Sequence, residues 1–109
     1  MANIYKNELI DLTTTDNTVV YTTPADSRAI IKSILVSEDA GSGSTITLTL
    51  TDTSSNVFSL FKTKAISANA TEELLTHPLV ITEGEVIKAT AASGNRLHIV
   101  FSVLQITRD

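Results

Sequence analysis

The sequence predicts an all-β fold, a single-domain antiparallel β-sandwich of the jelly-roll kind with about eight short strands. Three observations lead to this prediction. The stretch from Arg28 to Ser37 is rich in β-branched residues and carries apolar side chains on both of its alternating faces. The stretch from Thr45 to Thr51 alternates strictly between threonine and isoleucine or leucine. Turn residues separate stretches of this kind at regular spacing along the whole chain.

The size and composition of the chain limit the classes of protein to which it can belong. Its 109 residues predict one domain over 1–109, in which residues 1–6 are a possible N-terminal arm. It contains no cysteine, which excludes a disulfide framework and a thiolate metal site. A net charge of −4 argues against sequence-independent binding of nucleic acid. No signal peptide and no apolar run of about 20 residues is present, so we expect a protein made in a cytoplasm without membrane contact.

The polar residues of the chain are mostly uncharged. Only 18% of its residues are charged, against the roughly 25% that is usual in soluble domains, and threonine and serine are abundant. A hydroxyl costs much less to bury than an ion does. The composition therefore favours a surface that contacts other proteins, although threonine is also ordinary on the solvent-facing side of any strand.

The first half of the chain is expected to form four strands. Glu8–Thr13 and Thr18–Thr22 are short strands, and Arg28–Ser37 is a central strand covered on both faces. The Gly/Ser-rich residues 38–44 predict a hairpin loop, after which Thr45–Thr51 forms a half-buried strand. In the central strand, strict alternation divides the apolar side chains, with Ala29, Ile31 and Leu35 on one face and Ile30, Ile34 and Val36 on the other.

The second half predicts further strands at Val57–Lys64, Leu79–Thr82, Val86–Ala91 and Arg96–Thr107. The segment 66–75 is ambiguous, because Asn69 and Glu72 have the spacing of a helix capping box. We prefer a loop followed by a strand at 73–76, since the segment runs directly into Pro78. The residues expected in the core are Ile31, Ile46, Leu48, Leu50, Phe61, Ile87, Ile99 and Phe101.

No group of residues in the sequence has the pattern of a catalytic or metal site. Gly41-Ser42-Gly43 lacks the lysine and the following helix of a phosphate loop, so a turn is the better interpretation. His77 and His98 lie in different segments without a third ligand or a paired acid, and both are expected at the surface. We therefore predict that the chain is not an enzyme and has no catalytic residues, cofactor or metal.

The last strand suggests a contact surface. Leu97, Ile99, Phe101 and Val103 form a core stripe on one of its faces, but Val100, Leu104 and Ile106 are apolar on the other. Either a second layer of the same chain covers this face, or another protein does, since exposed apolar patches usually mark interfaces. The threonine side of the 45–51 strand is the second candidate. The candidate interface residues are Val100, Leu104, Ile106, Thr45, Thr47, Thr49 and Thr51.

Two longer motifs carry a resemblance to a known family. Residues 21–37, YTTPADSRAIIKSILVS, and residues 77–106, HPLVITEGEVIKATAASGNRLHIVFSVLQI, are similar to segments of small virion structural proteins of tailed, especially marine, bacteriophages. The matching residues are Tyr21, Pro24, Ile31, Lys32, Ser33 and Ile34 in the first motif and Pro78, Leu79, Gly84, Glu85, Ser102 and Leu104 in the second. Asp39 and Gln105 depart from the pattern, which has an asparagine and an acid at these places.

The resemblance implies a β-sandwich subunit that assembles in many copies on a virion after synthesis in the bacterial host cytoplasm. A capsid decoration (cement) protein that binds the head as a homo-oligomer is the first expectation, and a neck, tail or fibre-attachment subunit is the alternative. Its partners would be the major capsid protein or neck and tail subunits, without nucleic acid or membrane.

A carbohydrate-binding module is a less favoured alternative, because sugar recognition uses exposed aromatic platforms. The chain has no tryptophan, and Tyr5 and Tyr21 are its only tyrosines.

Overall fold

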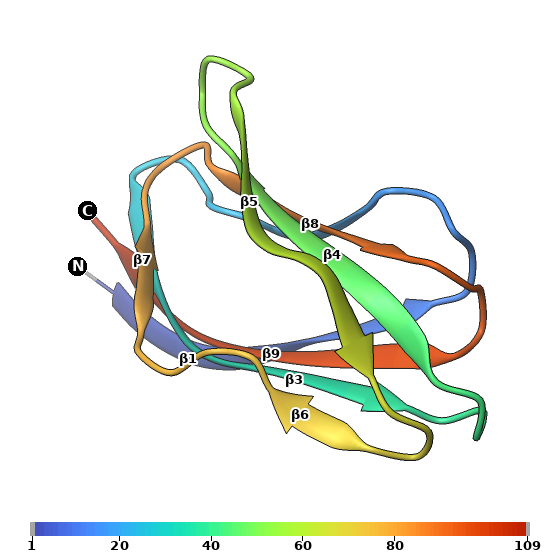
Figure 1. Ribbon diagram of the computed structural model, residues 1–109. Coiled ribbons are helices and arrows are strands. Elements are labelled where there is room, and N and C mark those ends of the chain that lie inside the picture. Colours follow the sequence, from blue (N-terminus) through green and yellow to red (C-terminus); the bar gives the residue numbers. More distant parts are fainter. Residues whose placement is uncertain (1, 109) are drawn as a thin grey trace.

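In the computed structural model, which describes residues 2–108, nine antiparallel strands form two sheets packed face to face (Figure 1). No helix occurs between residues 2 and 108. The predicted all-β sandwich is therefore confirmed. The strands are β1 (Ala2–Leu12), β2 (Thr18–Thr22), β3 (Ser27–Glu38), β4 (Ser44–Thr51), β5 (Val57–Ile66), β6 (Thr71–Glu73), β7 (Leu79–Ile81), β8 (Val86–Ala91) and β9 (Leu97–Thr107).

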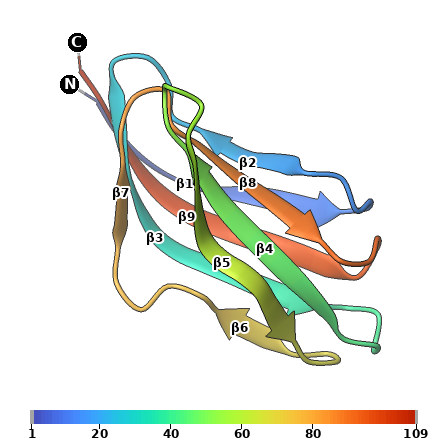
Figure 2. The same cartoon turned by 45° about the horizontal axis from the view of Figure 1, so that its top comes forward.

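The order of the strands gives the sandwich a jelly-roll arrangement. One sheet runs β1-β9-β3, and both β6 and β7 pair with the far side of β3. The other sheet runs β2-β8-β4-β5. Figure 2 shows these two layers and the loops that carry the chain from one to the other at their ends. Strands that are neighbours in a sheet are mostly distant in the sequence, so the fold depends on long-range pairing.

A β-bulge in β3 changes which of its side chains face the core. Ile31 pairs with Val103 and Ser33 with Ser102, so Lys32 is an extra residue without its own partner on β9. The alternation therefore shifts by one position after Lys32, and Ile31 and Ile34 both point inward. The expectation of strict alternation in this strand is wrong. The buried apolar residues of β3 are Ala29, Ile31, Ile34 and Val36.

The outer face of β3 is not covered by the described chain. β3 is an internal strand, as predicted, with β9 on one side and β6 and β7 on the other. Its outward residues Ile30 and Leu35, however, are only half-buried. The expectation that both faces of this strand are covered is therefore wrong.

The N-terminal residues form a regular strand. β1 pairs with β9 in unbroken register from Ala2, opposite Thr107, to Leu12, opposite Leu97. The sequence predicts a strand only from Glu8, with residues 1–6 as a possible arm or a loosely paired start. Residues 2–6 are instead held by the ladder to β9, while Met1 lies outside the described residues.

The connection from β3 to β4 crosses between the two sheets, so the predicted hairpin is wrong. The buried carboxylate of Glu38 holds this connection. Its two oxygens accept hydrogen bonds from four backbone amides, at 2.9 Å from Asn69 and Gly41, 3.1 Å from Ala40 and 3.5 Å from Ser42. These amide donors, with that of Asn69 contributing most, lower the pKa of Glu38 against the opposing effect of burial.

The ambiguous segment before Pro78 contains no helix. Asn69 has a left-handed backbone, with φ of 57°, and β6 occupies Thr71–Glu73. The preference for a loop and a short strand over a helix is confirmed, but the predicted bounds 73–76 are wrong, because the strand covers 71–73 and shares only Glu73 with the prediction. The other predicted strands of this half agree with β5, β7, β8 and β9 to within two residues at each end.

The core fills the space between the sheets with aliphatic side chains. Six of the eight residues predicted in the core are buried, and Leu50 and Phe61 pack against it while remaining partly exposed. The predicted stripe Leu97, Ile99, Phe101 and Val103 is buried throughout.

One hydrogen bond joins the two sheets inside this core. The Tyr21 hydroxyl of β2 donates to Gln105 Oε1 of β9 at 2.7 Å, and its ring stacks on Phe101 at 5.7 Å between centroids. Burial, followed by the nearby Glu8, raises the pKa of Tyr21, so the hydroxyl keeps its proton. Gln105, which departs from the virion motif, thus has a defined partner in this protein.

Replacing Glu38 by Gln is expected to lower the melting temperature at neutral pH, because an amide cannot accept four backbone hydrogen bonds as a carboxylate does. The folded-state pKa of Glu38 lies below the ordinary value of 4.5, so its stabilisation is complete above that value and is lost as the pH falls through the folded pKa. Thermal unfolding of both proteins between about pH 7 and pH 3 tests this.

The stability difference between wild type and Glu38→Gln should shrink below about pH 4.5. Asp52, whose pKa is also lowered, mainly by the Asn56 backbone amide, is present in both proteins and cancels in the comparison. A difference that stays constant over this pH range would contradict the role given to the Glu38 carboxylate.

Candidate assembly surface

The predicted interface residues of the last strand lie together on the outside of the sandwich. Val100, Leu104 and Ile106 all point away from the core on β9, and each is half-buried. Because β9 lies between β1 and β3, their neighbours are the outward side chains of those two strands. We call this surface the β1–β9–β3 face.

Backbone pairing aligns the outward residues of this face in five rows that cross the three strands. Each row is named here after its β1 residue. In order along the strands, the rows are Asp11–His98–Ser37, Leu9–Val100–Leu35, Asn7–Ser102–Ser33, Tyr5–Leu104–Ile30 and Asn3–Ile106–Arg28.

Two of the five rows are apolar. In the Leu9 row, Leu9 is 73% exposed beside half-buried Val100 and Leu35. In the Tyr5 row, Tyr5 is also 73% exposed, and Val80 of β7 extends the row beyond Ile30. Large side chains with this exposure are not part of the core, so the two rows form an apolar surface that faces solvent in the isolated chain.

A polar row separates the two apolar rows. Ser102 Oγ donates to Asn7 Oδ1 at 2.8 Å, and Ser33 Oγ donates to Glu73 Oε1. Glu73 Oε2 accepts the backbone amide of Ile34 at 2.8 Å, next to the bulge. The polar groups of this row are therefore engaged with one another within the chain.

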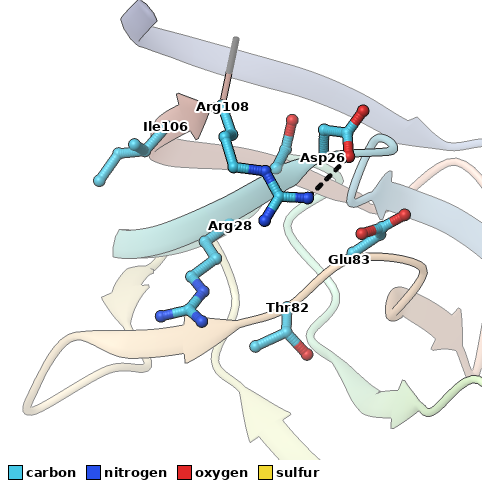
Figure 3. A pocket seen from close by; sticks show the side chains of 7 residues that line it. Asp26, Arg28, Thr82, Glu83, Ile106 and Arg108 are labelled. Carbon is cyan, nitrogen blue, oxygen red and sulfur yellow. Dashed lines mark hydrogen bonds and ion pairs between the residues drawn. The ribbon is translucent and has the colours of Figure 1, made fainter. Parts of the chain in front are cut away.

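The two end rows carry charge. At one end, His98 Nε2 lies 3.3 Å from Asp11 Oδ1, and a shallow pocket of about 190 Å³ opens beside them and Leu9. At the other end, Arg28 and Ile106 border a larger cavity of about 450 Å³. Figure 3 shows Arg108 beside Asp26 in the lining of this cavity, where the two form an exposed ion pair of 3.0 Å.

The predicted threonine surface is a separate face on the opposite sheet. Thr45, Thr47, Thr49 and Thr51 line the outside of β4, and all four are half-buried. Part of their hydrogen-bonding capacity is already used, since Thr47 Oγ1 accepts the backbone amide of Thr63 at 3.0 Å. Lys88 lies beside Thr49 and carries charge onto this face. The two surfaces proposed from the sequence therefore cannot belong to one patch.

Sequence reasoning missed Tyr5 and Leu9, the most exposed apolar residues of the β1–β9–β3 face. The alternation Tyr5, Asn7, Leu9 and Asp11 is present in the sequence, but the opposite side reads Ile4, Lys6, Glu8 and Ile10 and has no clear apolar stripe. The sequence pattern of β1 is therefore only a weak indication of a strand. Lys6 and Glu8 are tolerated on the inward side because β1 is an edge strand, where they form an ion pair of 3.3 Å.

The groups that could support chemistry are dispersed. His77 is exposed, and His98 faces outward on β9, as the sequence predicts for both. Between residues 2 and 108, no three His, Asp or Glu side chains come together in a way that could hold a metal ion. That same stretch also contains no helix long and apolar enough to cross a membrane.

The exposed aromatic residues do not form a platform for sugar. Tyr21 is buried, so it is not available at the surface. Tyr5 and Phe58 are exposed, but they lie on β1 and β5, which belong to different sheets. This arrangement does not favour the carbohydrate-binding module.

No known protein-family model matches the chain, and no curated protein matches its sequence. Its fold is similar to that of a solved chain from work titled "Bacillus endospore appendages form a novel family of disulfide-linked pili". The TM-score is 0.58 with 10% sequence identity, over 98% of this chain and 89% of that chain. At this identity the likeness concerns the fold alone. These comparisons do not support the phage origin that the sequence motifs imply.

Truncating Leu9 is expected to change the free energy of unfolding by no more than about 0.5 kcal/mol, because its side chain is exposed. Truncating Leu12 in the same strand, which is 1% exposed, should cost about 2–5 kcal/mol. Urea denaturation of Leu9→Ala and Leu12→Ala at low protein concentration tests this difference. Equal losses would place Leu9 in the core.

Proposed function

We propose that this chain is a non-enzymatic structural subunit of a multi-copy protein particle, and that it contacts other subunits through the β1–β9–β3 face. The observation that carries the proposal is the pair of apolar rows, in which Tyr5 and Leu9 are each 73% exposed beside half-buried Val100 and Leu104. Several large apolar side chains exposed on one sheet face, even with a polar row between them, favour a contact surface for other proteins.

Two further features support a structural role. Most of the polar residues of the chain are uncharged, which keeps the cost of desolvating a contact low. The similarly folded chain comes from work on pili, which are assemblies of many subunits. The disulfide link named in that title has no counterpart here, because this sequence contains no cysteine. Contacts made by this chain would therefore not include disulfide links between copies.

The virion motifs suggest which particle this could be. A capsid decoration (cement) protein that binds the head as a homo-oligomer is the first candidate, and a neck, tail or fibre-attachment subunit is the second. The head, neck, tail and fibre positions differ in symmetry and in partner proteins. A subunit at any of them needs a rigid core and a face that is readily desolvated. Locating the density of this chain in images of intact particles would decide between them.

Leu104→Asp is expected to weaken assembly by several kcal/mol, because an ionised, unpaired carboxylate would be buried at the centre of the contact. The measurement is sedimentation equilibrium of wild type and variant over a wide concentration range. Each variant must also show a cooperative thermal transition, because loss of folding would imitate loss of assembly.

The matched control is Thr49→Asp, which places the same charge on the outside of the other sheet. Self-association that survives Leu104→Asp but not Thr49→Asp would move the contact to the threonine face. A folded Leu104→Asp protein that assembles as wild type does would remove the β1–β9–β3 face from the proposal.

A further inference from the structure

The arrangement of the β1–β9–β3 face points to one particular partner, a second copy of this chain. The five rows are nearly symmetric about the Asn7 row, with an apolar row on either side of it and a polar or charged row at each end. A surface with this symmetry can match itself. If a second copy is turned over about an axis along the Asn7 row, its Tyr5 row faces the Leu9 row of the first, and the two Asn7 rows meet at the axis.

We infer that two copies pack face to face about a two-fold axis along the Asn7 row, with their strands antiparallel and Tyr5 of each copy seated in the Leu9–His98 pocket of the other. This inference rests on the proposed function, because it names the partner for the same face. The proposed function requires only that this face contacts other subunits. The inference adds the orientation of the two copies and the contact of Tyr5 with the pocket.

The pocket is the evidence for the orientation. It has a volume of about 190 Å³ and is lined by the outward residues Leu9, Asp11, His98 and Val100, together with Ile10 and Ile99. It therefore lies between β1 and β9 at the level of the Leu9 and Asp11 rows. Turning the copy about the Asn7 row places β1 over β1 and brings Tyr5, the projecting aromatic residue of the face, over this pocket.

The chemistry of the pocket matches a tyrosine side chain. Leu9 and Val100 supply apolar walls for the ring, whereas Asp11 and His98 supply polar atoms that could pair with the phenol hydroxyl at the pocket's far end. Tyrosine is favoured in interfaces because it buries a large ring and satisfies one polar group. The two-fold axis creates the contact twice in each pair.

The alternative axis, parallel to β9, does not produce this match. It would place β1 of one copy over β3 of the other, so Tyr5 would lie above Ile30 and Val80 and the pocket beneath Leu35. The axis along the Asn7 row also brings the end that carries Asp11 toward the end that carries Arg28 of the other copy. Asp11 then lies over Asn3 and Arg28 over Ser37, so no two like charges of the end rows face one another.

The size of the face is sufficient for a modest dimer. The three strands of the face, about 4.8 Å apart and about nine residues long at roughly 3.3 Å each, span about 14 by 30 Å, and the three residues of β7 bring the projected area to about 480 Å². Side-chain relief raises the accessible area above this projection. The contact therefore approaches the roughly 800 Å² per partner of a standard interface.

Single cysteines introduced into this cysteine-free chain test the orientation. Ser102 lies on the proposed axis, so Ser102→Cys should form a disulfide-linked dimer under mild oxidation. Val100 faces Leu104 of the other copy, so Val100→Cys and Leu104→Cys should cross-link poorly alone and well when mixed. Thr49→Cys, on the opposite sheet, is the control that should stay unlinked.

Two outcomes would overturn the antiparallel pairing. If Val100→Cys alone cross-links as well as the mixture does, the copies are parallel. If wild-type self-association is abolished by Leu104→Asp yet none of the cysteine variants cross-links, the pairing is wrong while the proposed function stands. A chain that remains monomeric at millimolar concentration would also overturn the pairing, and binding to other particle proteins would then test the proposed function separately.

The contact of Tyr5 has its own test. Tyr5→Ala should weaken the dimer at least tenfold without changing the unfolding of the monomer, because this side chain is exposed in the isolated chain. Val19→Ala, an exposed apolar residue of β2 on the other sheet, is the matched control and should have no effect. Equal dissociation constants for Tyr5→Ala and wild type would remove the pocket contact.

Discussion

The pairing of β3 with β9 through the bulge at Lys32 is the constraint on which the rest of the structure depends. A strand that alternates strictly would place Leu35 in the core and Ile34 outside. The extra residue reverses this, so that Ile31 and Ile34 both fill the core and Leu35 joins the outer surface. One additional residue in β3 thus turns Ile34 into the core and places Leu35 on the outer surface beside Val100.

Buried polar groups connect parts of the chain that belong to different sheets of the sandwich. The Glu38 carboxylate gathers amides from two loops, so the connection between the sheets and the approach to β6 share one anchor. The Tyr21 hydroxyl and Gln105 join β2 to β9 across the core. Each of these groups has its partner within the chain, which is the condition under which a buried polar group is tolerated.

The two outer faces of the sandwich have different chemistry. The β4 side carries threonine hydroxyls and Lys88 and is suited to water, whereas the β1–β9–β3 face carries two apolar rows between polar ones. The β1–β9–β3 face is therefore the one on which we place the proposed contact with other subunits.

The sequence by itself determined the fold class, most strands and most of the core. Local alternation carried this information: Thr45–Thr51 and Leu97–Val103 show clear two-residue periods, and their inward residues are buried as predicted except Leu50, which is half-buried. It also identified Val100, Leu104 and Ile106 as apolar residues outside the core stripe.

Only the tertiary structure decided which strands are neighbours, and this pairing brought the residues of the β1–β9–β3 face together. The bulge at Lys32, the pairing of residues 2–6 with β9 and the crossing of the 38–44 connection between sheets all depend on partners 60 or more residues away or on the opposite sheet. No local pattern encodes such partners, because a strand's hydrogen bonds are satisfied by another part of the chain. Tyr5 and Leu9 therefore became part of the same face as Val100 and Leu104 only when the two ends of the chain paired.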